Sequence, residues 1–118
     1  MGHLFHILAA NEWASAQAQG SYAPVSLESE GFIHLSREGQ VVETANRFYR
    51  GVQGLIVLVV DANAVEADVV WEEGEPGVLF PHLYRPLRVQ EVVQSTELIE
   101  ENGRWIELRE QTASPASP

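Results

Sequence analysis

The sequence predicts an α+β fold built around a mainly antiparallel, twisted sheet. Helical patterns lie in the first half of the chain, whereas strand patterns dominate the second half. Short turn-forming segments separate the later strands, as they do in hairpins. Few helices stand between strands and no glycine-rich phosphate loop is present, so a doubly wound parallel sheet is disfavoured.

The composition fits one folded domain. The chain has 118 residues, of which 45% are hydrophobic, and it has no cysteine for disulfides or thiolate ligands. We expect residues 1–110 to form a single domain and the polar tail 111–118 to be disordered. The longest apolar run, residues 55–60, is too short to span a bilayer, and the N-terminus does not resemble a signal peptide. A soluble, cytoplasmic protein is therefore expected.

The first elements are a strand and a short helix. Residues 4–8 are apolar around one histidine, which predicts a strand. We expect Asn11 to cap the helix, because its side chain accepts hydrogen bonds from free N–H groups. Gly20 is expected to end the helix, because glycine adopts the left-handed conformation of a C-cap. Residues 21–29 lack periodicity and predict a loop that borders a site.

A second strand and a second helix follow. Residues 32–35 are apolar and come directly after Gly31, which predicts a short strand. Ser36 is placed to cap the next helix. That helix is expected to end before Gly51 and to bury one face, on which the apolar residues are Val41, Val42, Ala45, Phe48 and Tyr49.

The second half of the chain is rich in strand patterns. Residues 55–60 are apolar on both faces and mostly β-branched, which predicts a central strand covered on two sides. Asn102-Gly103 is a hairpin signature. The remaining strand patterns occupy residues 69–72, 78–84 and 87–93, with turn signals at 61–63 and 73–77.

The charge balance disfavours nucleic acid as a partner. Seven cationic residues, all arginine, face 17 acidic residues, which gives a formal charge of -10. Such a surface repels phosphate backbones. A small anionic ligand held by one local arginine stays compatible with this charge, and Arg47 and Arg85 are the candidates.

Three of the four histidines, namely His6, His34 and His82, lie inside apolar strand patterns. A buried imidazole needs a hydrogen-bond partner, which is supplied either by the protein itself or by a ligand. Because imidazole also exchanges protons near neutral pH, each ring is a candidate catalytic group. Three such rings on three strands favour one common histidine-lined cleft.

Further candidates for this cleft are polar and aromatic residues near the three histidines. Ser36 has two interpretations, a helix cap or a group at the rim of the site. Tyr22 and Tyr84 are suited either to packing or to stacking on a planar ligand. Trp13 belongs either to the core or to the edge of the cleft.

Motifs spread over residues 4–93 form a recognisable set. They are His6, Trp13, Gly20, Tyr22, Glu30-Gly31-Phe32-Ile33-His34, Ser36, Gln40, Phe48-Tyr49, Phe80-Pro81-His82, Tyr84, Pro86 and Leu87. Together they resemble the domain-of-unknown-function family 952.

That family is in turn similar to the ADP-ribosyltransferase-like fold. The similarity implies a split antiparallel sheet around a cleft for a nicotinamide dinucleotide. It also implies that His6 contacts the ribose and that the His34-x-Ser36 element lies near the nicotinamide ring. His82 takes the place of the third motif, where such enzymes often carry a glutamate.

Three functional hypotheses remain open at this stage. The first is a histidine-lined cleft that binds a nucleotide-like small molecule such as NAD, with ribosyl transfer or NAD glycohydrolysis as its chemistry. The second is a metal-dependent hydrolase with His6, His34 and His82 as its ligands. The third is a binding or interaction domain without catalysis. Because the chain has no cysteine and no two of these histidines share the close spacing of known zinc motifs, we expect no bound metal. No cofactor is firmly indicated, and NAD is the candidate.

Overall fold

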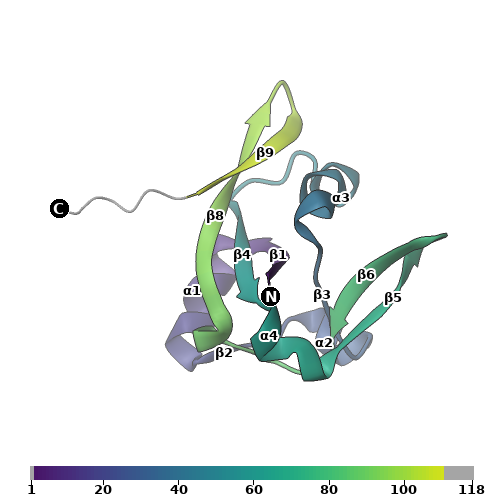
Figure 1. Ribbon diagram of the computed structural model, residues 1–118. Coiled ribbons are helices and arrows are strands. Elements are labelled where there is room, and N and C mark those ends of the chain that lie inside the picture. The colour runs from purple at the N-terminus through teal and green to yellow at the C-terminus, as the bar shows by residue number, and fades with distance from the viewer. Residues whose placement is uncertain (1, 111–118) are drawn as a thin grey trace.

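The computed structural model describes residues 2–110, which form short helices and nine strands (Figure 1). In chain order the elements are β1 (His3–Ala9), α1 (Ala10–Gln19), β2 (Ser21–Tyr22), α2 (Val25–Ser29), β3 (Ile33–His34), the 3₁₀ turn η1 (Glu38–Gln40), α3 (Val41–Phe48), β4 (Leu55–Asp61), α4 (Ala62–Val65), η2 (Glu66–Asp68), β5 (Val69–Glu75), β6 (Val78–Leu83), β7 (Leu87–Arg88), η3 (Val89–Glu91), β8 (Val92–Glu101) and β9 (Arg104–Glu110).

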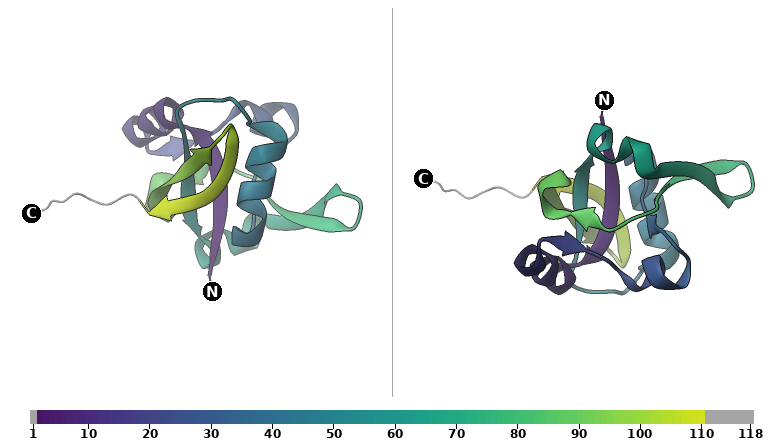
Figure 2. Two further views of the ribbon diagram at one scale, coloured as in Figure 1. Left: turned by 90° about the horizontal axis from the view of Figure 1, so that it is seen from above. Right: turned by 90° about the horizontal axis from the view of Figure 1, so that it is seen from below.

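The strands form three sheets in which every pairing is antiparallel. The largest sheet has the order β1-β4-β8-β9, a second has the order β3-β6-β5, and β2 pairs with β7. The β5–β6 hairpin extends away from the rest of the molecule in every view (Figures 1 and 2). The predicted mixture of a few helices with mainly antiparallel strands is confirmed.

Strand β4 lies at the centre of the large sheet, as its sequence predicts. Its alternate residues face two separate cores, because successive side chains of a strand point to opposite faces. Leu58 and Val60 enter a core that also contains Leu83 and Leu87, whereas Val57 and Val59 enter the core beneath α3. Burial on both faces explains the unbroken apolar run.

Helix α3 covers the second core. Val41 and Ala45 are fully buried, and α3 packs against β1 and β9. Phe48 was expected on the same buried face, and this is wrong, because its side chain is 68% exposed. It is the last residue of the helix and lines a cavity described below.

Two expected helix caps are wrong. Helix α1 begins at Ala10 without a side-chain cap, so Asn11 lies inside the helix, whereas Gly20 ends it with φ 90° as predicted. Ser36 does not cap a helix either. Its backbone N–H and C=O both bond to Phe5 of β1, each at 2.8 Å, so this residue extends the strand region instead.

The segment expected to be a loop, residues 21–29, instead contains strand β2 and helix α2. Strand β2 is stabilised by pairing with β7, a partner distant in sequence. Its two residues carry no periodicity that a local pattern could reveal.

The strand expected over residues 87–93 is interrupted. It consists of β7, the η3 turn and the start of β8. The turn expected at 61–63 is the start of α4, where the Asp61 carboxylate accepts a hydrogen bond from the Asn63 N–H. The hairpin predicted at Asn102-Gly103 is confirmed, and both residues have positive φ, as a type I′ turn requires.

Among residues 2–110, no helix is both long and apolar enough to cross a membrane. The tail expected at 111–118 lies outside the described residues. The single domain and the cytoplasmic location stay predictions.

Candidate functional site

A large cavity lies between β1, α2, α3 and the β5–β6 hairpin. Its volume is about 960 Å³. His6, His34 and His82 all line it, and so does Ser36. The three rings come from β1, β3 and β6, so the common histidine-lined cleft expected from the sequence is present.

His6 is buried, and both of its ring nitrogens are hydrogen-bonded within the protein. Nδ1 lies 2.7 Å from the backbone carbonyl of His34, and Nε2 lies 2.8 Å from the Tyr22 hydroxyl. Because a carbonyl only accepts, Nδ1 carries the proton, and the Tyr22 O–H donates to Nε2. Burial lowers the pKa of His6 to about 4, so the ring is neutral at pH 7.

Tyr22 therefore presents its oxygen to the cavity in a fixed orientation. Its hydroxyl proton points to His6, and its ring lines the cavity. Burial, followed by the nearby carboxylate of Glu12, raises the pKa of Tyr22. The phenol stays protonated, and its oxygen is free to accept a second hydrogen bond.

His34 and His82 lie directly opposite each other in the β3–β6 pair. Their ring centroids are 5.4 Å apart in an edge-on arrangement. Phe32 stacks on His82 with ring centroids 3.9 Å apart and an angle of 11° between the planes. The exposed His34 ring also donates from Nε2 to the Glu30 carboxylate at 3.1 Å. The register of two short strands thus brings two predicted site residues together.

His82 is held by a carboxylate behind it. Its Nδ1–H donates to Glu72 Oε1 at 2.6 Å, and the Tyr84 hydroxyl donates to the same oxygen at 2.7 Å. These hydrogen bonds keep the pKa of Glu72 below its usual range. With Nδ1 fixed as the donor, His82 presents Nε2 as the nitrogen that is free to exchange a proton.

The two candidate arginines have different places. Arg47 lines the cavity, where its guanidinium bonds to Glu75 at 2.6 Å. Arg85 does not line it. Its guanidinium donates to Asp68 at 2.8 Å and to both carboxylate oxygens of Glu91 at 3.0 Å. The guanidinium N–H groups that were expected to hold a ligand therefore bond to Asp68 and Glu91 instead, and Arg85 has a structural role.

Two aromatic candidates also lie outside the cavity lining. Trp13 packs against the core that contains Leu8 and Ala16. Tyr84 is partly exposed, packs against Phe32 and bonds to Glu72. Tyr84 therefore acts behind His82, and neither residue is placed to stack on a ligand in the cavity.

A family comparison agrees with the motifs noted in the sequence. The model of the family described as "Protein of unknown function (DUF952)" matches residues 7–95, which is most of the chain. The chain belongs to the DUF952 family. No curated protein matches this DUF952 chain.

Two solved structures of one bacterial protein are similar to this DUF952 protein. The crystal structure of protein CC0527 from Caulobacter crescentus has a TM-score of 0.79 at 40% identity, over 87% of this chain and 91% of that chain. The solution NMR structure of CC0527 has a TM-score of 0.76 at 41% identity, over 88% of this chain and 91% of that chain. The likeness to ADP-ribosyltransferases stays a prediction.

The structure adds site residues of this DUF952 protein that the sequence did not indicate. Glu72 belongs to no site pattern in the sequence, yet its carboxylate bonds to His82 and Tyr84. Glu72 lies two residues from Val70, which pairs with His82, so the two side chains are diagonal neighbours on one face of the hairpin. Only the register of β5 against β6 reveals this contact.

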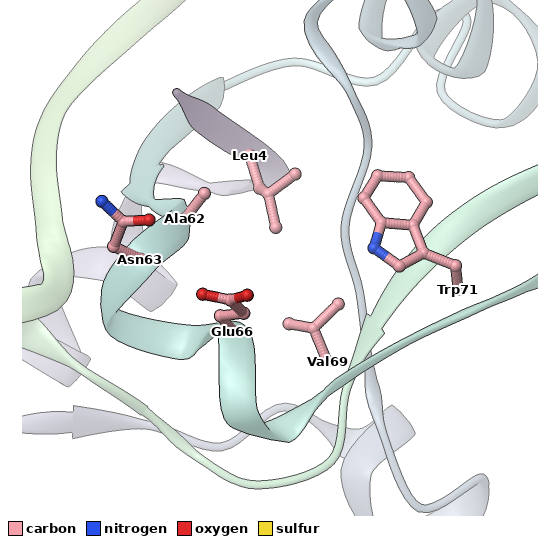
Figure 3. Close-up of a pocket in the computed structure, with 6 residues that line it drawn as sticks. All are labelled: Leu4, Ala62, Asn63, Glu66, Val69 and Trp71. Atoms are coloured by element: carbon pink, nitrogen blue, oxygen red, sulfur yellow. The ribbon is translucent and has the colours of Figure 1, made fainter. Parts of the chain in front are cut away.

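A second, smaller cavity lies near the start of β5 (Figure 3). Its volume is about 220 Å³, below the roughly 300 to 1,000 Å³ that small-molecule pockets occupy. Its lining consists of Leu4, Ala62, Asn63, Glu66, Val69 and Trp71. None of the predicted site residues faces it, and we assign it no ligand.

Proposed function

We propose that the large cavity of this DUF952 protein binds a nucleotide-like small molecule, with NAD as the leading candidate. The observation that carries this proposal is the convergence of His6, His34 and His82, from three separate strands, on one cavity. Three imidazoles that line one cavity, with His82 Nε2 and His34 Nδ1 left available, support a shared ligand.

The size and chemistry of the cavity support this proposal. Its volume of about 960 Å³ lies near the upper end of the roughly 300 to 1,000 Å³ of small-molecule pockets. Aromatic rings suited to a flat base line it, including Phe32, Phe48 and Tyr49. Hydroxyl and imidazole groups that suit a ribose line the same cavity.

Different histidines take different parts in the proposed complex. Because both nitrogens of His6 are occupied, His6 positions Tyr22, and the Tyr22 oxygen accepts a hydrogen bond from a ligand hydroxyl. His34 is exposed to the cavity and has Nδ1 available beside its contact with Glu30. His82 offers Nε2.

The chemistry that we propose for this site is cleavage at the ribosyl carbon. Water attacks that carbon as its bond to the departing ring nitrogen breaks, and the bonding electrons leave with the ring. His82 Nε2 takes the proton of the attacking water. Glu72, which bonds to Nδ1 on the far side of the ring, stabilises the imidazolium that forms.

The alternative metal site is not formed by the residues that the structure describes. Within residues 2–110, no group of three histidine or carboxylate side chains is placed to hold a metal ion. The Nδ1 proton of His6 and the hydroxyl proton of Tyr22 already occupy both directions from which His6 would bind a metal. The donor geometry therefore gives the hydrolase hypothesis no support.

Calorimetric titration with NAD, ADP-ribose and adenosine monophosphate tests the binding proposal. We expect NAD to bind with a dissociation constant on the order of 10 to 100 micromolar. The His34→Ala variant should bind about tenfold or more weakly, because a hydrogen bond to the ligand is lost. The matched control is His3→Ala, which removes an imidazole that does not line the cavity.

Two results would contradict the proposal. If none of the three ligands binds the wild-type protein at millimolar concentration, the nucleotide hypothesis fails. If His34→Ala and His3→Ala bind equally well, the ligand lies elsewhere. Chromatography of NAD after incubation with the protein separates catalysis from binding, since only cleavage releases free nicotinamide.

A further inference from the structure

The charge of the large cavity is strongly one-sided. Five glutamates and one arginine line it, and with neutral histidines this leaves a formal balance of four negative charges. The acidic residues are Glu12, Glu30, Glu43, Glu73 and Glu75. They come from α1, the turn before β3, α3 and β5, so four separate segments direct carboxylates to one space.

Most of this negative charge has no counter-charge in the described part of the chain. Glu75 pairs with Arg47, the cationic residue of the lining, and the Glu30 carboxylate bonds to the His34 ring. Glu12, Glu43 and Glu73 have no ion pair within residues 2–110. Burial first and then the charge of Glu12 raise the pKa of Tyr49, which shows that the Glu12 field reaches the aromatic part of the lining.

Aromatic faces lie beside these carboxylates. Phe48 is 68% exposed although it is a large apolar side chain, and it lines the cavity. The Phe80 ring lies over Gly74, where a Cβ atom would meet the ring at 2.5 Å, so the backbone of β5 is bare at this point to admit it. Aromatic faces attract cations through the negative potential of their π systems.

Polar groups of two largely buried residues also face this space without a protein partner. Ser36 is 6% exposed and lines the cavity, and its hydroxyl has no hydrogen bond within residues 2–110. His82 is equally buried, and its Nε2 is likewise without a partner in that part of the chain. Both atoms are reached from the cavity, because no fully buried side-chain nitrogen or oxygen of the described residues lacks a hydrogen-bond partner. They are therefore available to a bound molecule.

From the carboxylates, the exposed aromatic faces and the unpaired Ser36 and His82 groups we infer that the occupant of the cavity is a planar aromatic cation. This inference rests on the ligand-binding cavity of the proposed function and specifies the charge of the ligand. A ring with a fixed positive charge is attracted by the unpaired carboxylates and by the aromatic faces at once. A phosphate group in the same space is repelled, and only Arg47 lies there to offset this.

A pair of ligands that differ by one hydride tests the inference. Oxidised nicotinamide riboside carries an aromatic pyridinium ring, whereas its dihydro form has the same substituents on a ring that is neutral and no longer aromatic. Isothermal calorimetry at low ionic strength should show the cation binding about tenfold or more tightly than the neutral form. The advantage should shrink with added salt, because ions screen exposed charges.

Charge-neutralising variants locate the effect. The double variant Glu12→Gln/Glu43→Gln should lose most of the preference for the cation. The matched control is Glu100→Gln/Glu101→Gln, which removes the same charge at the far end of β8 and does not touch the cavity lining. Both double variants change the net charge of the protein by the same amount, so a long-range effect would appear in both. Because the control leaves the cavity carboxylates in place, it should keep the full preference.

The outcomes separate this inference from the proposed function. If NAD and ADP-ribose bind but the two ribosides bind with equal affinity, the charge inference is wrong and the nucleotide proposal stands. If both double variants reduce the preference equally, the cavity carboxylates are not responsible and the inference is also wrong. If the cation binds while ADP-ribose and adenosine monophosphate do not, the inference stands and the nucleotide proposal fails.

Discussion

Replacement of Arg85 by methionine is expected to lower the free energy of unfolding by about 3 kcal/mol, because it breaks a buried ion pair and leaves one partner behind. Glu91 is buried and receives two hydrogen bonds from the Arg85 guanidinium at 3.0 Å. Burial alone would raise the pKa of Glu91, but the bonds from Arg85 and from the Arg88 backbone outweigh it and hold the pKa below its usual range. The variant loses the larger part of this support.

The same arginine connects several segments. It also donates to Asp68 at 2.8 Å and to the backbone carbonyl of Ala64 at 3.3 Å, so it links η3 to the α4–η2 region. Urea denaturation of Arg85→Met measures the loss. Arg109→Met is the control, since the exposed pair of Arg109 with Glu107 should contribute no more than about 1 kcal/mol.

A double-mutant cycle with Glu91→Leu isolates the pair from the packing of the two side chains. If Arg85→Met is no more destabilised than Arg109→Met, the buried pair does not stabilise the fold. If the cycle gives no coupling between positions 85 and 91, the loss arises from packing alone.

Acidification is expected to destabilise the protein well above the range in which carboxylates titrate, because of His6. Burial lowers the pKa of His6 from 6.5 to about 4. Between these two values the imidazole is protonated in the unfolded chain and neutral in the folded protein. The stabilisation is fully present above pH 6.5 and is lost as the pH falls toward 4. The loss should be about 2 kcal/mol at pH 5 and about 3 kcal/mol at pH 4.

The pH dependence of urea denaturation measures this effect. Between pH 6.5 and 5 the wild-type protein should lose stability steadily, whereas His6→Gln should show a much flatter profile because it has no proton to gain. The variant starts from lower stability, so the slope is compared and not the value. His3→Gln is the matched control and should keep the wild-type slope, because it replaces an exposed imidazole that does not contact His6 or line the cavity. A wild-type profile that is flat over this range would contradict a neutral, buried His6.

The elements predicted correctly from the sequence are those determined by their own residues. The β4 run is apolar on both faces, and Asn102-Gly103 has the chemistry that a tight hairpin needs. The expectations that failed concern residues whose structure depends on distant partners. Ser36 bonds to the backbone of Phe5, and β2 exists because β7 lies beside it. Such pairings leave no local pattern.

The candidate site divides in the same way. The sequence indicated three histidines in apolar strands, and the structure brings all three to one cavity. The sequence did not predict the hydrogen-bond partners of these rings. His6 is fixed by Tyr22, 16 residues away, and His82 by Glu72 across a hairpin. Each depends on strand register, which a single sequence does not specify.

Strand β5 has a consequence for how molecules of this protein meet. It is the outer strand of the sheet β3-β6-β5, on a hairpin that extends away from the body (Figure 2). An edge strand of this kind has backbone N–H and C=O groups without a strand partner, to which a second copy of the chain could add a strand. Glu72, Glu73 and Glu75 lie along it, and strand addition between two such edges would bring like charges close together. The carboxylates of β5 therefore disfavour edge-to-edge aggregation. Negative charge that faces the cavity thus also contributes to the repulsion between molecules at high concentration.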